Sequence, residues 1–238
     1  MPSINQVSPL AFSGRHVRAE IVTDVKDLPL PGRTIVVNLD TTPAYLANEP
    51  RTPIPALSST IAVGTTLEQA AAVALLRVDD DRPAAGIIDE PGWQHFTDIA
   101  GEAVFPRSTS LFRSPQADAG VARLDPAALL GAAHPAGRER TFAIRLMLWY
   151  SAAGTDCGIH NQHDFIETHA QILGYGRMQK FTEPDTRSLY EDVLMSPGYA
   201  TPVPFCAPGP DDTFVYPWHQ YRADTDCVWL AVEYHLTD

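Results

Sequence analysis

The sequence is poor in cysteine and in positive charge, and each shortage excludes a class of protein. Its 238 residues hold three cysteines, Cys157, Cys206 and Cys227. These are too few and too scattered for a disulfide framework or a CxxC zinc site. Lys and Arg number 17 against 29 Asp and Glu, which gives a net charge of −12 without any basic cluster. We therefore expect no binding to nucleic acid.

Long apolar runs and a leader pattern are also lacking. The stretch MPSINQVSPLAFSG does not show the basic and apolar segments of a signal peptide. No apolar run reaches the ~18 residues that a membrane-spanning helix needs. We therefore expect a cytoplasmic protein that has no membrane partner.

Proline, in contrast, is plentiful, and 21 prolines favour short strands and turns over long helices. In the first half, β-branched segments bounded by turn formers predict strands at residues 16–23, 33–39 and 58–64. Residues 65–78 predict a helix that begins at a threonine cap, with a buried strand over 72–78 as the alternative. The following segment, 79–137, is interpreted as connection, with a short helical piece at 126–133.

From residue 140 onward the polarity alternates with a period of two, which is typical of strands. The stretch TFAIRLMLWY places Phe142, Ile144, Leu146 and Leu148 on one face, and Arg145, Met147 and Trp149 on the other. Further strands are predicted at residues 171–181, 213–222 and 227–235. Short strands separated by turns predict an all-β protein, an antiparallel sandwich or barrel.

Histidine is concentrated in this second half, where five of the eight histidines lie between residues 160 and 235. The stretch GIHNQHDFIETHAQILGYG holds three of them together with Glu167. On a strand, Glu167, His169 and Gln171 share one face because side chains repeat every two residues. A histidine and carboxylate cluster of this kind indicates a metal site.

These residues resemble the cupin superfamily, whose first motif is G(X)5HXH(X)3,4E(X)6G. His163, Glu167 and Gly174 reproduce its second half, and His219 stands where the second motif supplies one more histidine. The resemblance implies a cupin-type antiparallel β-barrel, a jelly roll, over residues 136–238. Residues 1–135 are then a β-rich extension or a degenerate second cupin.

The resemblance also implies the metal ligands: His163, Glu167 and His219, with His169 as a fourth ligand or in place of Glu167. The chain departs from the motif at Asn161, where the family has its first histidine. His160 is out of register by one, so we expect its side chain on the other face. Two histidines and one carboxylate suit Fe(II), although the same donors can hold Zn, Mn, Ni or Cu.

Several residues around this centre are candidates for substrate binding and catalysis. Arg145 among apolar neighbours would bind a substrate carboxylate if its face is buried. The other candidates are Trp149, Gln171 and Trp218 for substrate binding, and His169 and Tyr221 for catalysis. The expected partner is a small molecule, with a carboxylic acid as one class, and the expected assembly is a homodimer.

Three functions remain open at this point. The first is an Fe(II)-dependent oxygenase of the dioxygenase type. The second is a non-redox lyase, isomerase or cyclase in which the metal acts as a Lewis acid. The third is a ligand-binding cupin without turnover.

Overall fold

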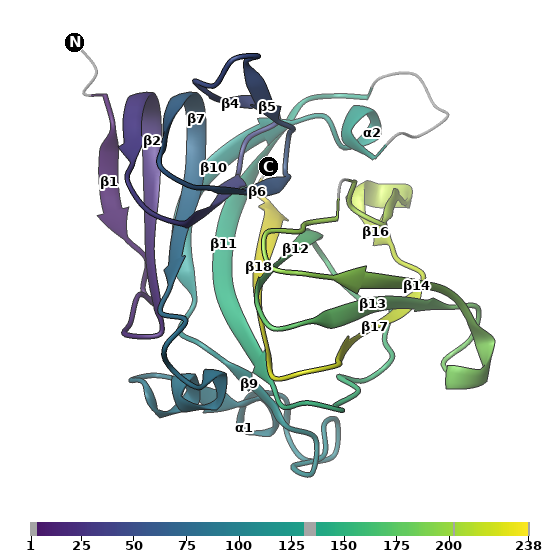
Figure 1. Ribbon diagram of the computed structural model, residues 1–238. Coiled ribbons are helices and arrows are strands. Elements are labelled where there is room, and N and C mark those ends of the chain that lie inside the picture. The colour runs from purple at the N-terminus through teal and green to yellow at the C-terminus, as the bar shows by residue number, and fades with distance from the viewer. Residues whose placement is uncertain (1–3, 131–136, 202, 238) are drawn as a thin grey trace.

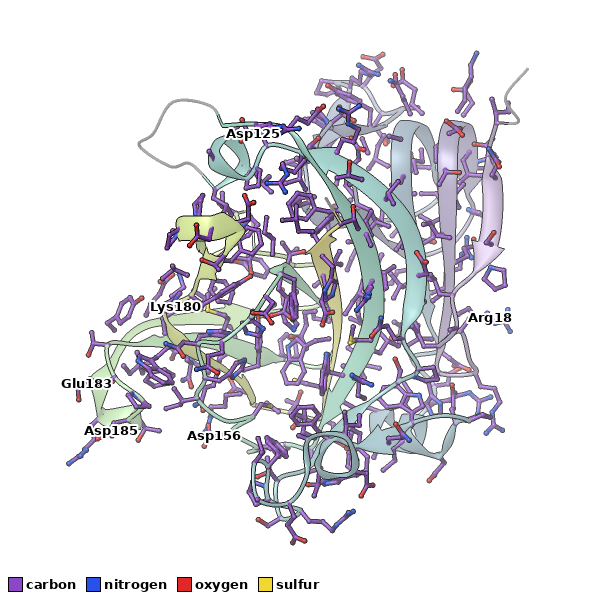
Figure 2. The ribbon with its side chains drawn as sticks, turned by 180° about the vertical axis from the view of Figure 1, so that it is seen from behind. Arg18, Asp125, Asp156, Lys180, Glu183 and Asp185 are labelled. Carbon is purple, nitrogen blue, oxygen red and sulfur yellow. The ribbon has the colours of Figure 1, made fainter. Side chains whose placement is uncertain are left out.

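Three antiparallel β-sheets lie side by side in the computed structural model, which describes residues 4–130, 137–201 and 203–237 (Figure 1). The sheet from the N-terminal part of the chain forms one outer layer, and the sheet that holds β13, β14 and β17 forms the other. Between them lies a sheet built around β11 and β18. Figure 2 shows the molecule from behind, with Arg18 on the first sheet and Lys180 on the third at opposite ends of this stack.

The first sheet has the strand order β1-β2-β7-β3-β6, and β4 pairs with β5 and β7. Its strands are β1 Gln6–Pro9, β2 Val17–Leu30, β3 Thr34–Asn38, β4 Ala44–Leu46, β5 Thr52–Ile54, β6 Ser59–Ala62 and β7 Thr65–Val78. The strands expected at residues 16–23, 33–39 and 58–64 are therefore confirmed as β2, β3 and β6.

The helix expected over residues 65–78 is wrong, because the whole segment is strand β7. This strand is hydrogen-bonded to β2 on one side and to β3 on the other. Val73 and Leu75 pack into the core on one face of the sheet, while Ala74 and Leu76 pack into the core on the other. Burial on both faces outweighs the helix propensity of the alanines and leucines, and the alternative of a buried strand over 72–78 is the correct one.

The central sheet has the order β12-β18-β11-β9-β8, and β10 also pairs with β11. Its strands are β8 Gln94–His95, β9 Leu111–Arg113, β10 Ala117–Leu124, β11 Arg140–Ser151, β12 Ile166–Leu173 and β18 Cys227–Leu236. The third sheet, of order β14-β13-β17, consists of β13 Gly176–Phe181, β14 Leu189–Met195 and β17 Trp218–Ala223. A separate pair is formed by β15 Ala207–Pro208 and β16 Phe214–Val215.

Short helices lie in the connections. They are η1 Ala84–Asp89, α1 Phe96–Ala100, α2 Pro126–Leu129, η2 Thr186–Ser188 and η3 Pro210–Asp212. Of the helical piece expected at residues 126–133, α2 covers the first turn, and residues 131–133 lie outside the described part of the chain. No helix in the described residues is long and apolar enough to cross a membrane.

The two faces of the central sheet have different roles, which follow the alternation of each strand. Even-numbered residues such as Ile144, Ile166 and Leu230 pack against the first sheet in one large core. Odd-numbered residues such as Trp229 face the third sheet, where they form a smaller core with Met178 and its neighbours. Because the chain crosses between the central and third sheets at two hairpins, β12–β13 and β17–β18, the two motifs that contain histidine end up facing each other.

The strand pairing confirms the expected all-β, antiparallel fold. Among the described residues, the central and third sheets form separate hydrogen-bonded units that face each other, and no closed ring of strands is found. The expected domain boundary at residue 135 stays a prediction. Strands β9 and β10, which precede it, are paired with β11 in the same sheet.

Candidate metal centre and its cavity

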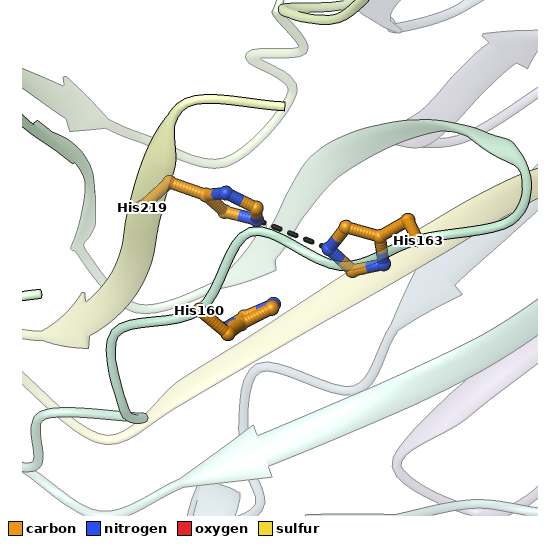
Figure 3. Close-up of side chains that lie close together, drawn as sticks. All are labelled: His160, His163 and His219. Carbon is orange, nitrogen blue, oxygen red and sulfur yellow. Dashed lines mark hydrogen bonds between the residues drawn. The ribbon is translucent and has the colours of Figure 1, made fainter. Parts of the chain in front are cut away.

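Three histidines, His160, His163 and His219, lie together between the central and third sheets (Figure 3). One ring nitrogen from each lies within 4.8 Å of the other two. We call this group the histidine cluster. Nε2 of His163 lies 3.2 Å from Nε2 of His219.

The position of His160 corrects the expectation that its side chain turns to the other face. That expectation assumed that His160 belongs to the strand that carries Glu167, but this strand begins only at Ile166. The loop before it runs along β17 instead. There the backbone amides of His160 and His219 each donate to the other's carbonyl oxygen at 2.9 Å, and this pairing brings the two rings together.

Backbone carbonyls fix the tautomers of two rings in the cluster. Nδ1–H of His219 donates to the Pro217 carbonyl at 2.9 Å, and Nδ1–H of His160 donates to the Gly158 carbonyl at 3.0 Å. In both rings Nε2 is then unprotonated, and in His219 this nitrogen accepts a hydrogen bond from Nε2–H of His163 at 3.2 Å. Hydrogen bonds of this kind orient histidines that bind metals.

The cluster is uncharged at neutral pH. Burial lowers the pKa of His163 to about 4 and that of His219 to about 3, and in both cases the neighbouring histidine His160 adds to the effect. Burial also lowers the pKa of His160. Neutral imidazoles are the form that binds a metal ion.

This donor set fits a divalent metal ion. Two nitrogens bonded tetrahedrally to one ion at 2.0–2.1 Å would lie about 3.3 Å apart, close to the 3.2 Å between the Nε2 atoms of His163 and His219. Two of the rings already have their lone pairs fixed by backbone carbonyls. The residues that would hold the ion are therefore His160, His163 and His219.

Glu167 and His169 lie beside the cluster on β12 and are both buried. Oε1 of Glu167 is 3.7 Å from Nε2 of His169. The hydroxyl of Tyr216 accepts from the Glu167 amide and donates to the Phe165 carbonyl, both at 2.9 Å, and so holds the bend from which β12 starts.

These two buried side chains are both shifted toward their neutral forms. Burial raises the pKa of Glu167, and the carboxyl of Glu233, its register partner on β18, raises it further. Burial also lowers the pKa of His169 well below its usual range, as do the nearby histidines of the cluster. Nδ1 of His169 is buried and has no hydrogen-bond partner among the described residues.

A cavity of about 570 Å³ opens beside these groups. Most of its wall is aromatic or aliphatic, and its lining includes His160, His163, Glu167 and His169. The aromatic residues of the wall are Phe96, Phe105, Trp149, Phe165, Tyr221 and Trp229. The cavity therefore offers an apolar binding space with polar groups concentrated near the histidine cluster.

The structure brings some of the expected substrate-binding and catalytic residues to the cavity and leaves others away from it. Trp149 and Tyr221 line it. Gln171 does not, because a bulge follows it in β12 and its side-chain amide donates to the Leu173 carbonyl at 2.7 Å. Trp218 does not either, since it alternates with His219 on β17. The roles of these residues stay predictions.

Arg145 also lies outside the cavity lining. It shares a face of β11 with Met147 and Trp149 but is itself exposed, so burial does not require a carboxylate partner for it, and its substrate role stays a prediction. An exposed arginine needs no anionic partner, because water solvates its charge.

The cavity also contains residues that the sequence did not reveal. Phe96, Phe105 and Arg113 come from the segment interpreted as connection. Phe96 contacts the rings of Phe105 and Trp149 edge-on, with centroids 4.9 and 5.1 Å away. Strand β9 is only three residues long, so no periodic pattern marked this segment as part of a site.

Comparison with known proteins assigns neither a family nor a function to this chain. No family model matches the chain, and no curated protein matches it. Solved structures that it resembles include an RmlC-like cupin protein from Desulfovibrio desulfuricans, at 16% identity over 38% of this chain and 71% of that one, with a TM-score of 0.26. Two others are the oxalate decarboxylase of Lactobacillus farciminis (10% identity, 100% and 83% of the chains, TM-score 0.31) and an ectoine synthase from P. lautus (15%, 60% and 78%, 0.30). Likenesses of this size carry no argument about function.

The pH dependence of metal affinity should reveal whether Glu167 joins the histidines as a ligand. Because His163 and His219 stay neutral down to about pH 4, three histidines alone give a Zn(II) affinity that is flat from pH 8 to 5. A Glu167 ligand has to lose its proton, and its raised pKa then makes the affinity fall about tenfold per pH unit below that pKa. Competition with a chromophoric chelator measures the slope. We expect the flat profile, and a unit slope that Glu167→Gln abolishes would show carboxylate ligation.

Proposed function

We propose that this protein is a metal-dependent enzyme that acts on a small organic substrate, and that it is an Fe(II) oxygenase. One observation carries the proposal: the three uncharged histidines of the cluster lie beside a cavity with largely apolar walls. A bound Fe(II) ion would supply the redox chemistry that couples dioxygen to oxidation of the substrate.

The protein's own side chains would bind the substrate and handle protons. The rings of Phe96, Phe105 and Trp149 form a continuous wall that holds an apolar substrate and excludes water. Glu167 is placed to hold and release a proton, because burial and the neighbouring Glu233 raise its pKa. His169 is close enough to the carboxyl to exchange that proton after a small movement, since the two side chains are 3.7 Å apart.

A second candidate, a non-redox lyase, isomerase or cyclase, is favoured by Tyr221. Its hydroxyl is buried without a hydrogen-bond partner among the described residues, and its ring stacks on His169 at 4.1 Å. A phenol in this position could donate a proton to a substrate held in the cavity. In that case the metal would act as a Lewis acid.

Oxygen consumption separates these candidates. Protein purified without chelators is analysed for metal, then loaded with Fe(II) and supplied with small organic compounds in an oxygen electrode. We expect substrate-dependent oxygen uptake that a His219→Ala variant lacks. Turnover that proceeds equally well without oxygen and with Zn(II) indicates the non-redox enzyme. Binding without turnover under any of these conditions contradicts the enzyme proposal and leaves a ligand-binding cupin.

Substitution of His169 tests the division between residues that hold the metal and residues that move protons. Because the three histidines of the cluster supply the donors, His169→Gln should keep bound metal near the wild-type level. Loss of a proton carrier should lower turnover by a factor of about 10²–10⁴. Metal analysis and kinetics on the same preparation measure both quantities, and Glu167→Gln is run alongside. If His169→Gln empties the site, His169 is a ligand and the division is wrong.

A further inference from the structure

Arg113 is a half-buried cation in the wall of the cavity, and its side chain makes no hydrogen bond or ion pair within the described residues. It lies at the end of β9, where its backbone pairs with Trp149 of β11. Its Nε atom is buried and has no hydrogen-bond acceptor, and its guanidinium makes no ion pair within the described ranges. Other arginines of the described chain, such as Arg177 and Arg222, are paired with aspartates. A buried donor that lacks an acceptor is costly in a folded protein and calls for an explanation.

The surroundings of Arg113 leave its charge available to a ligand. Glu233 is a nearby carboxyl in the same wall, and the charge of Arg113 acts against the rise that burial gives to the pKa of Glu233. The two side chains form no direct ion pair, and Oε2 of Glu233 lies 2.7 Å from Nε2 of His235. The histidines in the lining are neutral at pH 7. Arg113 is therefore the one permanent positive charge among the described residues of the lining.

The neighbours of Arg113 also indicate what kind of ligand would reach it. Its guanidinium carbon lies 6.0 Å from the centroid of the Trp149 ring, which belongs to the same aromatic wall as Phe96 and Phe105. A ligand that pairs with this guanidinium must bring an acceptor, and a carboxylate matches the fork of donors that a guanidinium presents. The rest of the ligand would then lie against aromatic rings.

We propose that Arg113 binds the carboxylate of a small aromatic acid whose ring occupies the cavity beside Trp149. This inference deepens the proposed function, because it names the class of substrate for the same cavity. It does not need a metal ion, and so it can be tested on the protein with or without one.

The test is calorimetric titration of the full chain, metal-free and again loaded with Zn(II). The ligands are benzoate, 3-phenylpropanoate and 1-naphthoate, each paired with its neutral amide. We expect wild-type protein to bind at least one acid more tightly than its amide. Arg113→Gln should weaken binding of that acid about 10- to 100-fold, since a charge-assisted hydrogen bond is lost. Binding of the amide should change little, and Arg113→Lys should restore part of the affinity for the acid.

Two control variants sharpen the result. Arg18→Gln removes an exposed arginine on the first sheet (Figure 2) and should leave binding of the acid unchanged. Arg145→Gln removes the arginine that the sequence suggested. If Arg145→Gln weakens binding and Arg113→Gln does not, the assignment is overturned.

The remaining outcomes also decide the proposal. It is overturned if acid and amide lose affinity equally in Arg113→Gln, since the arginine then only shapes the wall, or if wild-type protein binds none of the three acids. Failure of the proposed function would look different. In that case the metal-free protein binds the acid through Arg113, but the histidine cluster takes up no metal.

Discussion

His219→Ala should reduce metal affinity by more than about 100-fold. Loss of a residue that only orients a ligand already costs about 10- to 100-fold. In the proposed centre His219 would be a direct donor, and the hydrogen bond from its Nδ1–H to the Pro217 carbonyl sets the orientation of its ring. The His219 ring is fully buried, and its Nε2 atom lies 3.2 Å from Nε2 of His163. An alanine at this position therefore leaves the centre one nitrogen donor short. Metal content after dialysis and Zn(II) competition measure the loss.

The matched control is His95→Ala. His95 caps α1 by accepting from the Thr97 amide and contacts Phe112, but it does not belong to the cluster. The His95→Ala variant should retain full metal content, although α1 loses its N-terminal cap. The circular dichroism spectrum of His219→Ala should match that of the wild type, because the core between the first and central sheets does not involve this residue. If His219→Ala keeps its metal, the cluster is a structural feature and the proposed centre is wrong.

Gly174→Ala should destabilise the fold by about 4 kcal/mol or more. Gly174 has φ +73°, a left-handed conformation that costs an alanine about 1–2 kcal/mol. A Cβ atom at this position would also lie 2.0 Å from the carbonyl oxygen of Asp226. That carbonyl cannot move away easily, because the amides of Asp224 and Thr225 donate to the Tyr175 carbonyl and lock the two hairpin turns together.

Gly154→Ala separates the two contributions. Gly154 has φ +79°, but a Cβ atom there would meet nothing within 4 Å. It should therefore lose only the conformational part, about 1–2 kcal/mol. Urea unfolding of both variants gives the free energies. Equal losses would mean that the turn at residues 224–226 yields to the added methyl group and that the close approach of the two hairpins is not a constraint.

Particular strands and residues show how much of the structure could be predicted from the sequence. The second half of the sequence predicted β11 and β18 nearly to the residue, because β-branched and aromatic residues bounded by turn residues mark both segments as strands. The same method failed for β7, in which burial on both faces removes the period of two and leaves only helix propensity. Family spacing pointed to His163 and His219. It misplaced His160 because the rule of alternation was applied to a loop.

The amino-acid sequence by itself determined the all-β class and the two segments that carry the histidines, because strand period, turn residues and motif spacing are local properties of the chain. Only the tertiary structure decided which donors meet and what surrounds them. The backbone pairing of His160 with His219 and the packing of Phe96 and Arg113 against Trp149 join residues that are 36 to 59 positions apart. Contacts across such separations depend on how the sheets face each other, and no local pattern records that arrangement.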